Sequence, residues 1–358
     1  SHSQALTSVD FSKATSLETI GKYAFSNCDK LANVNISNAT KLETISEQAF
    51  YDCDGFTKID LSKATKLETI GEYAFYQCYK LSNFTITKSI KTIGAGAFEY
   101  CDILANVDLS NATNLTTINE STFSCCEKLT TVKLPSTITS IADNAFMNCI
   151  DMTTINLPES ITSIGKHAFE ACHKLGNIKF PSTLKIINEE TFRGCNSFTD
   201  VNLSNLQNLT TIGRGAFYNC EKLTNVKLPS SVTEIGAMAF TYCDSLADIT
   251  FSNTAIPKMA NNSFETGKPG MIVRLPFGSK RSEWENAMKN AGAINPVIII
   301  ENENTVAGYG LYKADGSIVS CDEKGENVGA ELQSKDITNL IVANDVIGIQ
   351  NSAFSHSQ

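Results

Sequence analysis

Apolar and polar residues alternate in short runs that recur along most of the chain. In residues 31–53, LANVNISNATKLETISEQAFYDC, Leu31, Val34 and Ile36 are apolar and the two asparagines between them are polar. Alternation over four residues is typical of a short strand with one buried face. Ten further segments match it: SVDF, KIDL, NFTI, NVDL, TVKL, TINL, NIKF, DVNL, NVKL and DITF. The pattern predicts eleven short strands.

Each predicted strand is followed by a turn, by a second apolar pair such as Leu42 and Ile45, and by a short segment that could be helical. That segment contains Phe50, with Cys53 three residues later. The Phe-x-x-Cys pair occurs ten times, and its phenylalanines are 25, 25, 23, 25, 23, 23, 23, 25 and 23 residues apart. Repeats with LS(N/K)AT turns have the longer period, and most repeats with LP turns have the shorter one. A fixed period of this size is the signature of a solenoid.

The fold class that follows is a β-rich α/β solenoid. Each repeat forms one turn of a right-handed coil, and equivalent strands pair in parallel about 4.8 Å apart. No single repeat can cover its own apolar face, so the core forms only between neighbouring turns. Inward-facing residues should therefore stack in columns along the array.

The recurring motif I-G-x-x-A-F-x-x-C-x-x-L-x-x-V-x-L-P resembles the BspA-like leucine-rich repeat family. The resemblance covers residues 5 to about 265 and resumes at 337–354. It implies a surface or secreted protein, of the kind found mostly in host-associated anaerobic bacteria and in some protists. The best-known member is an adhesin for matrix and clotting proteins, so the resemblance implies an adhesin-like role.

The pattern changes near residue 267 and predicts four segments. They are a solenoid of about eleven repeats over 1–267, a strand–helix–strand cap over 268–300, a β-hairpin module over 301–336 and the start of a further repeat over 337–358. In the predicted cap helix, SEWENAMKNAG, Ser282 and Glu285 have the spacing of a capping box and Gly292 follows the end. Trp284 should plug the open face of the last repeat.

The two ends of the chain share the tetrapeptide SHSQ. Joined, they read IGIQNSAFSHSQALTSVDF, which is a well-formed repeat. One interpretation is a 354-residue unit repeated in tandem in a longer protein. The other is one array that has been cut at an unusual place.

Composition and charge narrow the functional classes. The net charge is -9 and only 19% of the residues are charged, which disfavours a nucleic-acid partner. No apolar run is long enough to span a bilayer, and no signal peptide is visible in this chain. Ser/His/Asp sets, P-loops and HExxH motifs do not occur. We expect no catalytic residue, no metal site and no cofactor.

Ten of the twelve cysteines occupy one position of the repeat. A column of parallel side chains is poorly suited to tetrahedral metal binding or to disulfide geometry. The favoured interpretation is a column of buried thiols with raised pKa values. The expected core ladder comprises Phe25, Cys28, Phe50, Cys53, Phe75, Cys78, Phe98, Cys101, Phe146, Cys149, Phe169, Cys172, Phe217, Cys220, Phe240 and Cys243.

Four residues outside the column invite other hypotheses. Cys125 precedes a column cysteine and should face the other way, as a reactive or dimer-forming thiol or as an ordinary surface thiol. Cys321 lies in the hairpin module. His167 and His173 flank Cys172 and suggest a metal pair, but neighbouring core residues should make them emerge at different places, so solvated histidines are favoured.

Two surfaces are candidates for binding. The first is the concave face formed by outward strand residues: Asn33, Asn35, Lys58, Asp60, Asn106, Asp108, Lys133, Lys179, Asp200, Asn202, Lys227 and Asp248. It lacks the aromatic residues that dominate protein interfaces. The second, rival surface is a stripe of tyrosines beside the Phe/Cys corner: Tyr23, Tyr51, Tyr73, Tyr76, Tyr79, Tyr100, Tyr218 and Tyr242.

These observations favour a non-enzymatic protein of the cell surface or extracellular space that binds another extracellular protein, from host matrix or another cell surface. The alternative is a structural spacer that displays another module and carries no ligand on its repeats. Binding assays on matrix proteins would separate the two.

Overall fold

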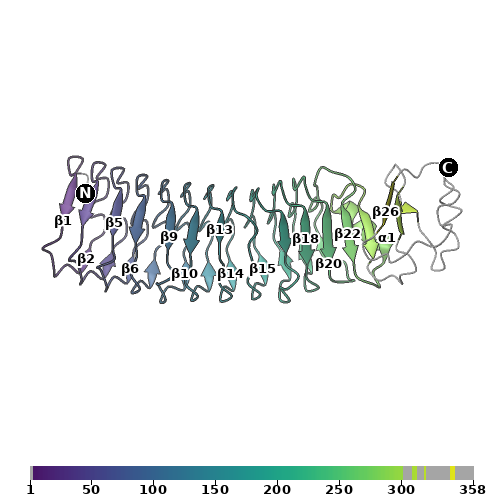
Figure 1. Ribbon diagram of the computed structural model, residues 1–358, viewed down its shortest axis with the longest axis horizontal. Coiled ribbons are helices and arrows are strands. Elements are labelled where there is room, and N and C mark those ends of the chain that lie inside the picture. The colour runs from purple at the N-terminus through teal and green to yellow at the C-terminus, as the bar shows by residue number, and fades with distance from the viewer. Residues whose placement is uncertain (1–2, 301–308, 313–317, 320–338, 343–358) are drawn as a thin grey trace.

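The chain winds into an elongated solenoid with its turns stacked along the long axis (Figure 1). The structure is a computed structural model that describes residues 3–300 and the strand residues 309–312, 318–319 and 339–342. Parallel strands form the body of the solenoid, as the repeat pattern predicts, and helix is almost absent from it.

The alternating segments form the first row of parallel strands. In register, Val9 lies opposite Val34, and Val107 lies opposite Val132. The row comprises β1 (Ser8–Asp10), β3 (Asn33–Asn35), β5 (Lys58–Asp60), β7 (Asn83–Thr85), β9 (Asn106–Asp108), β11 (Thr131–Lys133), β13 (Thr154–Ile155), β16 (Asp200–Asn202), β18 (Asn225–Leu228) and β20 (Asp248–Phe251). The predicted strand NIKF, residues 177–180, is not formed.

The second apolar pair of each repeat forms a second row of two-residue strands, which the sequence pattern did not predict as strands. These are β2 (Thr19–Ile20), β4 (Thr44–Ile45), β6 (Thr69–Ile70), β8 (Thr92–Ile93), β10 (Thr117–Ile118), β12 (Ser140–Ile141), β14 (Ser163–Ile164), β15 (Ile186–Ile187), β17 (Thr211–Ile212), β19 (Glu234–Ile235) and β21 (Lys258–Met259). The isoleucines at the second position of these strands point inward; Ile45, for example, is fully buried.

The Phe/Cys segment is not helical, because two of its residues, four positions apart, adopt left-handed backbone conformations. The residues two before and two after each phenylalanine have positive φ, as at Gln48 (φ 53°) and Asp52 (φ 54°). Alternate N–H groups therefore point to the next turn instead of back along their own turn. Phe50 N–H donates to the carbonyl of Ala74 at 2.8 Å. The segment thus forms a third backbone ladder between turns.

The core is a set of columns inside these three ladders. Eleven phenylalanines, one from each turn between Phe25 and Phe264, stack with ring centroids 5.1–5.6 Å apart. Phe25 is half-buried in the first of these turns, whereas Phe50 and the following members are fully buried. Each turn is covered by its neighbours, as solenoid stacking requires.

Asparagine side chains replace backbone hydrogen bonds where the rows are interrupted. Between β14 and β15, the amide of Asn188 donates to the carbonyl of Ile164 at 2.6 Å, and Asn119 makes the same bond to Ile93 between β8 and β10. At the missing strand, the side-chain oxygen of Asn177 accepts from the N–H of Thr199 at 2.9 Å. A side-chain amide can reach across a gap that the backbone cannot close.

The solenoid ends in β22 (Ile272–Leu275), helix α1 (Arg281–Asn290) and β23 (Val297–Ile300). Both strands continue the first row in parallel. Trp284 is fully buried, its ring centroid lies 4.7 Å from that of Phe251, and its indole N–H donates to the carbonyl of Thr254 at 3.2 Å. Trp284 therefore closes the apolar end of the array.

The predicted capping box is wrong. Helix α1 begins at Arg281, and its N-cap is Lys280, which makes no side-chain cap bond, so Ser282 lies within the first turn. The helix end follows the prediction: Gly292 has φ 98°, and the N–H groups of Gly292 and Ala293 return to the carbonyls of Lys289 and Met288. This is the Schellman arrangement that glycine favours.

Three further strands lie beyond residue 300. β24 (Tyr309–Tyr312) pairs antiparallel with β25 (Ile318–Val319) and with β26 (Asn339–Val342). The residues between β24 and β25, Cys321 and the part of the predicted further repeat after residue 342 lie outside the described residues. Within the described part of the chain, no helix has the length and apolar character needed to cross a bilayer.

Candidate functional site

The outward residues of the first strand row are exposed or half-buried, and many bind one another. The Lys133 ammonium lies 3.0 Å from the Asp108 carboxylate, and Arg274 Nε lies 2.8 Å from Asp248. The amide of Asn106 accepts from the hydroxyl of Thr131 at 2.8 Å. This face is therefore polar, and most of its polar groups have hydrogen-bond or ion-pair partners in adjacent turns.

Several candidate residues on this face also build the longer turns. The Asp60 carboxylate accepts from the N–H of Ser62 at 2.9 Å, and Asn35, Asp108 and Asn202 accept in the same way from the serine two residues later. This is the Asx-turn geometry. The bonds from Ser110 and Lys133 lower the pKa of the Asp108 carboxyl. These four residues thus have a structural role in the 25-residue repeats.

The remaining candidates on this face differ in their contacts. Lys179 pairs with Glu159 at 2.7 Å, and the N–H of Asp200 donates to the side-chain oxygen of Asn177 at 3.1 Å. Asn33, Lys58 and Lys227 are exposed. The face brings these twelve residues into a single surface along the array but gathers them around no common point.

The column cysteines are buried and free, and their thiols have a specific partner. Each thiol from Cys53 to Cys243 donates to the carbonyl of the phenylalanine in the preceding turn, at 3.0–3.3 Å. Burial raises the pKa of Cys53 to about 12 and raises that of Cys78 well above its usual value. Such thiols are weak nucleophiles, because the thiolate is the reactive form.

Cys125 is the partly exposed cysteine among the described residues. It adopts the left-handed conformation (φ 57°), which turns it away from the column. Its sulfur lies 3.6 Å from the Asn148 amide nitrogen and 3.6 Å from the Ser124 hydroxyl. These contacts hold the side chain on the surface of the Phe/Cys segment.

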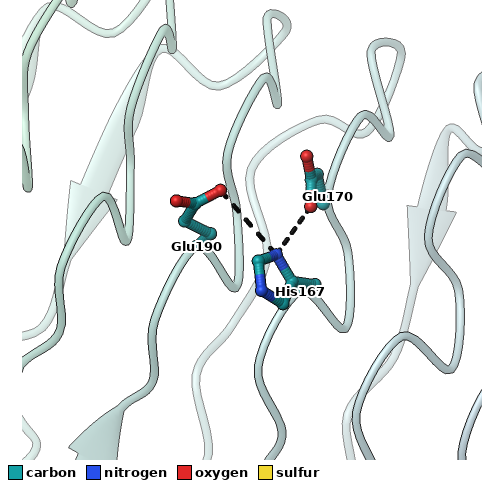
Figure 2. A group of neighbouring side chains, drawn as sticks. All are labelled: His167, Glu170 and Glu190. Atoms are coloured by element: carbon teal, nitrogen blue, oxygen red, sulfur yellow. Dashed lines mark hydrogen bonds and ion pairs between the residues drawn. The ribbon is translucent and has the colours of Figure 1, made fainter.

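His167 forms a half-buried cluster with two glutamates (Figure 2). Its Nδ1 lies 2.7 Å from an oxygen of Glu170 in the same turn and 3.8 Å from an oxygen of Glu190 in the next turn. One potential ligand atom from each residue lies within 4.8 Å of the others, so the three could approach a cation. The left-handed conformation of His167 (φ 56°) places it on this outer surface.

Arginine already neutralises both carboxylates of this cluster. Arg193 Nη1 lies 2.8 Å from Glu190 and 3.1 Å from Glu170, and Arg214 lies 3.5 Å from Glu190. A divalent cation would have to displace or repel these guanidinium groups. The arrangement is therefore better explained as an ion-pair network that links three turns. His173, which we expected to emerge at a different place from His167, contacts the carbonyl of Gly194 at 2.9 Å.

Four of the predicted tyrosines form one cluster on the Phe/Cys face. Tyr51 and Tyr76 stack with centroids 4.8 Å apart, and Tyr73 and Tyr100 meet Tyr76 edge-on at 5.5 and 5.6 Å. We call Tyr51, Tyr73, Tyr76 and Tyr100 the tyrosine cluster. All four side chains are half-buried. Tyr218 and Tyr242 form a separate edge-on pair at 5.3 Å.

Carboxylates surround the tyrosine cluster. Burial raises the pKa of Tyr76 to about 12, and the charge of Glu99 adds to this effect. Burial and the charge of Glu120 also raise the pKa of Glu99. The pKa of Tyr73 is raised by burial and then by Glu99, Glu120 and Glu72. These groups lie in a region of negative potential.

The residues directly after the phenylalanines form a row that sequence reasoning did not follow. From Phe50 to Phe217 these residues are Tyr51, Tyr76, Glu99, Ser124, Met147, Glu170, Arg193 and Tyr218, which we call the outer row; Ser26 and Thr241 occupy the same position at its two ends. Contacts between turns link Tyr51 to Tyr76, Glu170 to Arg193, and Arg193 to Tyr218. The sequence contains the signal for this row, because the residues that follow the phenylalanines at the repeat period include aromatic, acidic and basic residues side by side.

Comparisons with known proteins agree with this architecture. The model of the BspA type leucine-rich repeat region matches the chain in overlapping segments, 1–115, 43–176, 104–207 and 162–287. No curated protein matches the sequence.

Two solved structures are similar over most of their length. A leucine-rich repeat protein from Bacteroides ovatus is 26% identical, with a TM-score of 0.58, and the match covers 83% of this chain and 85% of that one. A leucine-rich cell surface protein from Faecalibacterium prausnitzii is 24% identical, with a TM-score of 0.50, over 80% of this chain and 84% of the other, which shows the shared fold alone. Since the family model matches well over half of the sequence, the chain belongs to the BspA-type leucine-rich repeat family.

Proposed function

We propose that this chain acts as a non-enzymatic, adhesin-like protein of the cell surface or extracellular space, which binds a protein of the host matrix or of another cell. The observation that carries the proposal is the contrast between inner and outer positions of the repeat. The Phe and Cys columns are repeated from turn to turn, whereas the outer row changes from Tyr to Glu to Arg. Such an array offers an extended surface whose chemistry varies along its length.

Membership of the BspA-type family supports a role in protein interaction. The first strand row contributes polar contacts at best, since most of its charged groups already bind a neighbour in the array. The aromatic residues that favour protein interfaces lie on the Phe/Cys face instead. The proposal therefore places binding on that face in preference to the outward strand residues.

The experiment is a binding panel with the full chain. Fibronectin, laminin, collagen and fibrinogen are immobilised, and association is measured by surface plasmon resonance over a concentration series. Saturable binding to at least one of these proteins, with serum albumin as the negative control, is the expected result.

A second candidate function is a spacer that displays another module. The observation in its favour is the internal pairing on the first strand row, for example between Lys133 and Asp108 at 3.0 Å. A face whose charges are mutually neutralised is well suited to solvent exposure. Complete absence of binding across the panel would favour the spacer and contradict the adhesin-like proposal.

A further inference from the structure

The second half of the outer row contains a cation held between a carboxylate and an aromatic ring. Arg193 Nη1 lies 3.1 Å from Glu170 of the preceding turn. Its guanidinium carbon lies 5.4 Å from the centroid of Tyr218 in the following turn. Guanidinium groups pair with carboxylates and stack on aromatic faces. On this surface, a guanidinium group thus occupies the space between a glutamate and a tyrosine.

The first half of the outer row has the same kind of neighbours without the cation. Tyr76 and Glu99 are successive members of the row, and Tyr51 stacks on Tyr76 at 4.8 Å. Within the described residues, no lysine or arginine forms an ion pair with Glu72, Glu99 or Glu120. Lys22, which interacts electrostatically with Glu72, forms its ion pair with Glu47 at 2.7 Å. Among the described residues, therefore, no ion pair neutralises these three carboxylates.

The tyrosine cluster is also held in place before any partner arrives. Three ring contacts, at 4.8, 5.5 and 5.6 Å, connect its four members. The ring of Tyr73 lies so close to the backbone of the next turn that a Cβ on Gly96 would fall 2.3 Å from its Cε1. Gly96 thus provides the space that the ring occupies. Rigid tyrosines lose little conformational entropy on binding, which is why they are common in binding surfaces.

We propose that the tyrosine cluster, with Glu72, Glu99 and Glu120, is the docking surface for an arginine-rich segment of a protein partner. Guanidinium groups of the partner stack on the exposed parts of the rings and pair with the three carboxylates, as Arg193 does within the chain. The inference rests on the proposed function and specifies its site and partner chemistry. Anionic nucleic acids and acidic membranes are disfavoured by the same negative potential.

The test uses fluorescence anisotropy with a labelled peptide of five Arg-Gly repeats, and with a Glu-Gly peptide as the negative control. The full chain is compared with Glu99→Gln, Tyr76→Ala and the control Glu170→Gln. Glu99 and Glu170 belong to the same row and their variants lose the same charge, but Glu170 already binds Arg193. Circular dichroism verifies that each variant is folded, and Glu99→Gln tests the site even if Tyr76→Ala does not fold.

We expect Glu99→Gln and Tyr76→Ala each to weaken binding of the Arg-Gly peptide roughly three- to tenfold, and Glu170→Gln to change it less than twofold. Equal effects of Glu99→Gln and Glu170→Gln would show general attraction to an acidic protein and overturn the proposal. Absence of peptide binding to the unmodified chain would overturn it as well. Matrix binding that survives Glu99→Gln and Tyr76→Ala would place the partner elsewhere and leave the proposed function intact.

Discussion

At the scale of single residues, each column cysteine is a weak hydrogen-bond donor in a dry environment. The Cys172 thiol lies 3.2 Å from the Phe146 carbonyl, and burial raises its pKa. The same carbonyl also accepts the N–H of Cys149 at 3.2 Å. Cysteine is suited to this position because its side chain is small and apolar enough for a close-packed core, yet can still donate to a neighbouring oxygen.

The raised thiol pKa values predict a loss of stability at alkaline pH. An unfolded thiol loses its proton near pH 8.5, whereas burial keeps eight column thiols protonated to higher pH, to about pH 12 at Cys53. The folded state therefore binds more protons above pH 8.5. The contribution of these thiols to the free energy of unfolding is fully present below that pH. It falls by about 1.4 kcal/mol per thiol per pH unit as pH rises toward the pKa values of the folded state.

The measurement is urea unfolding under reducing conditions at pH 7, 9.5 and 10.5. A Cys149→Ala/Cys172→Ala variant should be less stable at pH 7 but should lose less further stability with rising pH, by about 3 kcal/mol per pH unit for two thiols. Met152→Ala is the matched control, because Met152 is fully buried in the same turn as Cys149 but does not titrate. Parallel pH profiles for all three proteins would contradict the prediction.

At the scale of elements, the columns of buried side chains could be predicted from the sequence, but the backbone conformations between them could not. The positions of Val34, Ile36 and Cys53 follow from the sequence because the pattern recurs in phase, so each repeat reinforces the next. The left-handed conformations of Tyr23, Gln48 and Met238 could not be predicted from the sequence, because these residue types give no local signal for positive φ. Backbone bonds to the adjacent turn impose that conformation.

Similar limits apply to the ends and interruptions of the strand rows. Ser282 and Glu285 have capping-box spacing, but the helix begins two residues earlier than that motif requires. Asn188 occupies the position that glycine has in many repeats, and the sequence does not reveal that its side chain replaces a backbone bond. For the tyrosine cluster, the residues were identified from the sequence. Their contacts with Glu99 required the register between turns.

The closing element predicts a localised effect of Trp284→Ala. Trp284 is fully buried between α1 and β20, so its removal should cost about 3–5 kcal/mol, as for other large aromatic truncations in cores. Hydrogen exchange should accelerate mainly in β20, β22 and β23, since a solenoid transmits such changes through neighbouring turns only.

Phe277→Ala is the control for that experiment, because the Phe277 side chain is 61% exposed. It should leave exchange in these strands unchanged. Uniform acceleration from β1 to β23 after Trp284→Ala would instead mean that the array unfolds as a single unit.

At the scale of the whole molecule, the solenoid is held by three backbone ladders and a set of side-chain columns, all of which run between adjacent turns. The first strand row, the second strand row and the Phe/Cys segment each contribute one ladder. Each turn therefore makes equivalent contacts with the turn before it and the turn after it, so turns of the same length are interchangeable. Stability should approximate a sum over turns and their interfaces.

This interchangeability predicts that one complete turn can be removed from the middle of the array. Deleting residues 124–146 joins Phe123 to Met147 and preserves the 23-residue spacing to Phe169. The phenylalanine stack then remains continuous, and the molecule should shorten by about 5 Å. Deleting residues 124–135 removes only about half a turn and breaks the register, so the apolar positions of the following turns lose their partners. The first variant should retain the far-ultraviolet circular dichroism of the parent and a cooperative unfolding transition, whereas the second should lose both. Small-angle X-ray scattering measures the change in length. If the two deletions were equally harmful, the contacts that stabilise this solenoid would extend beyond neighbouring turns, and the sum over turns would not describe it.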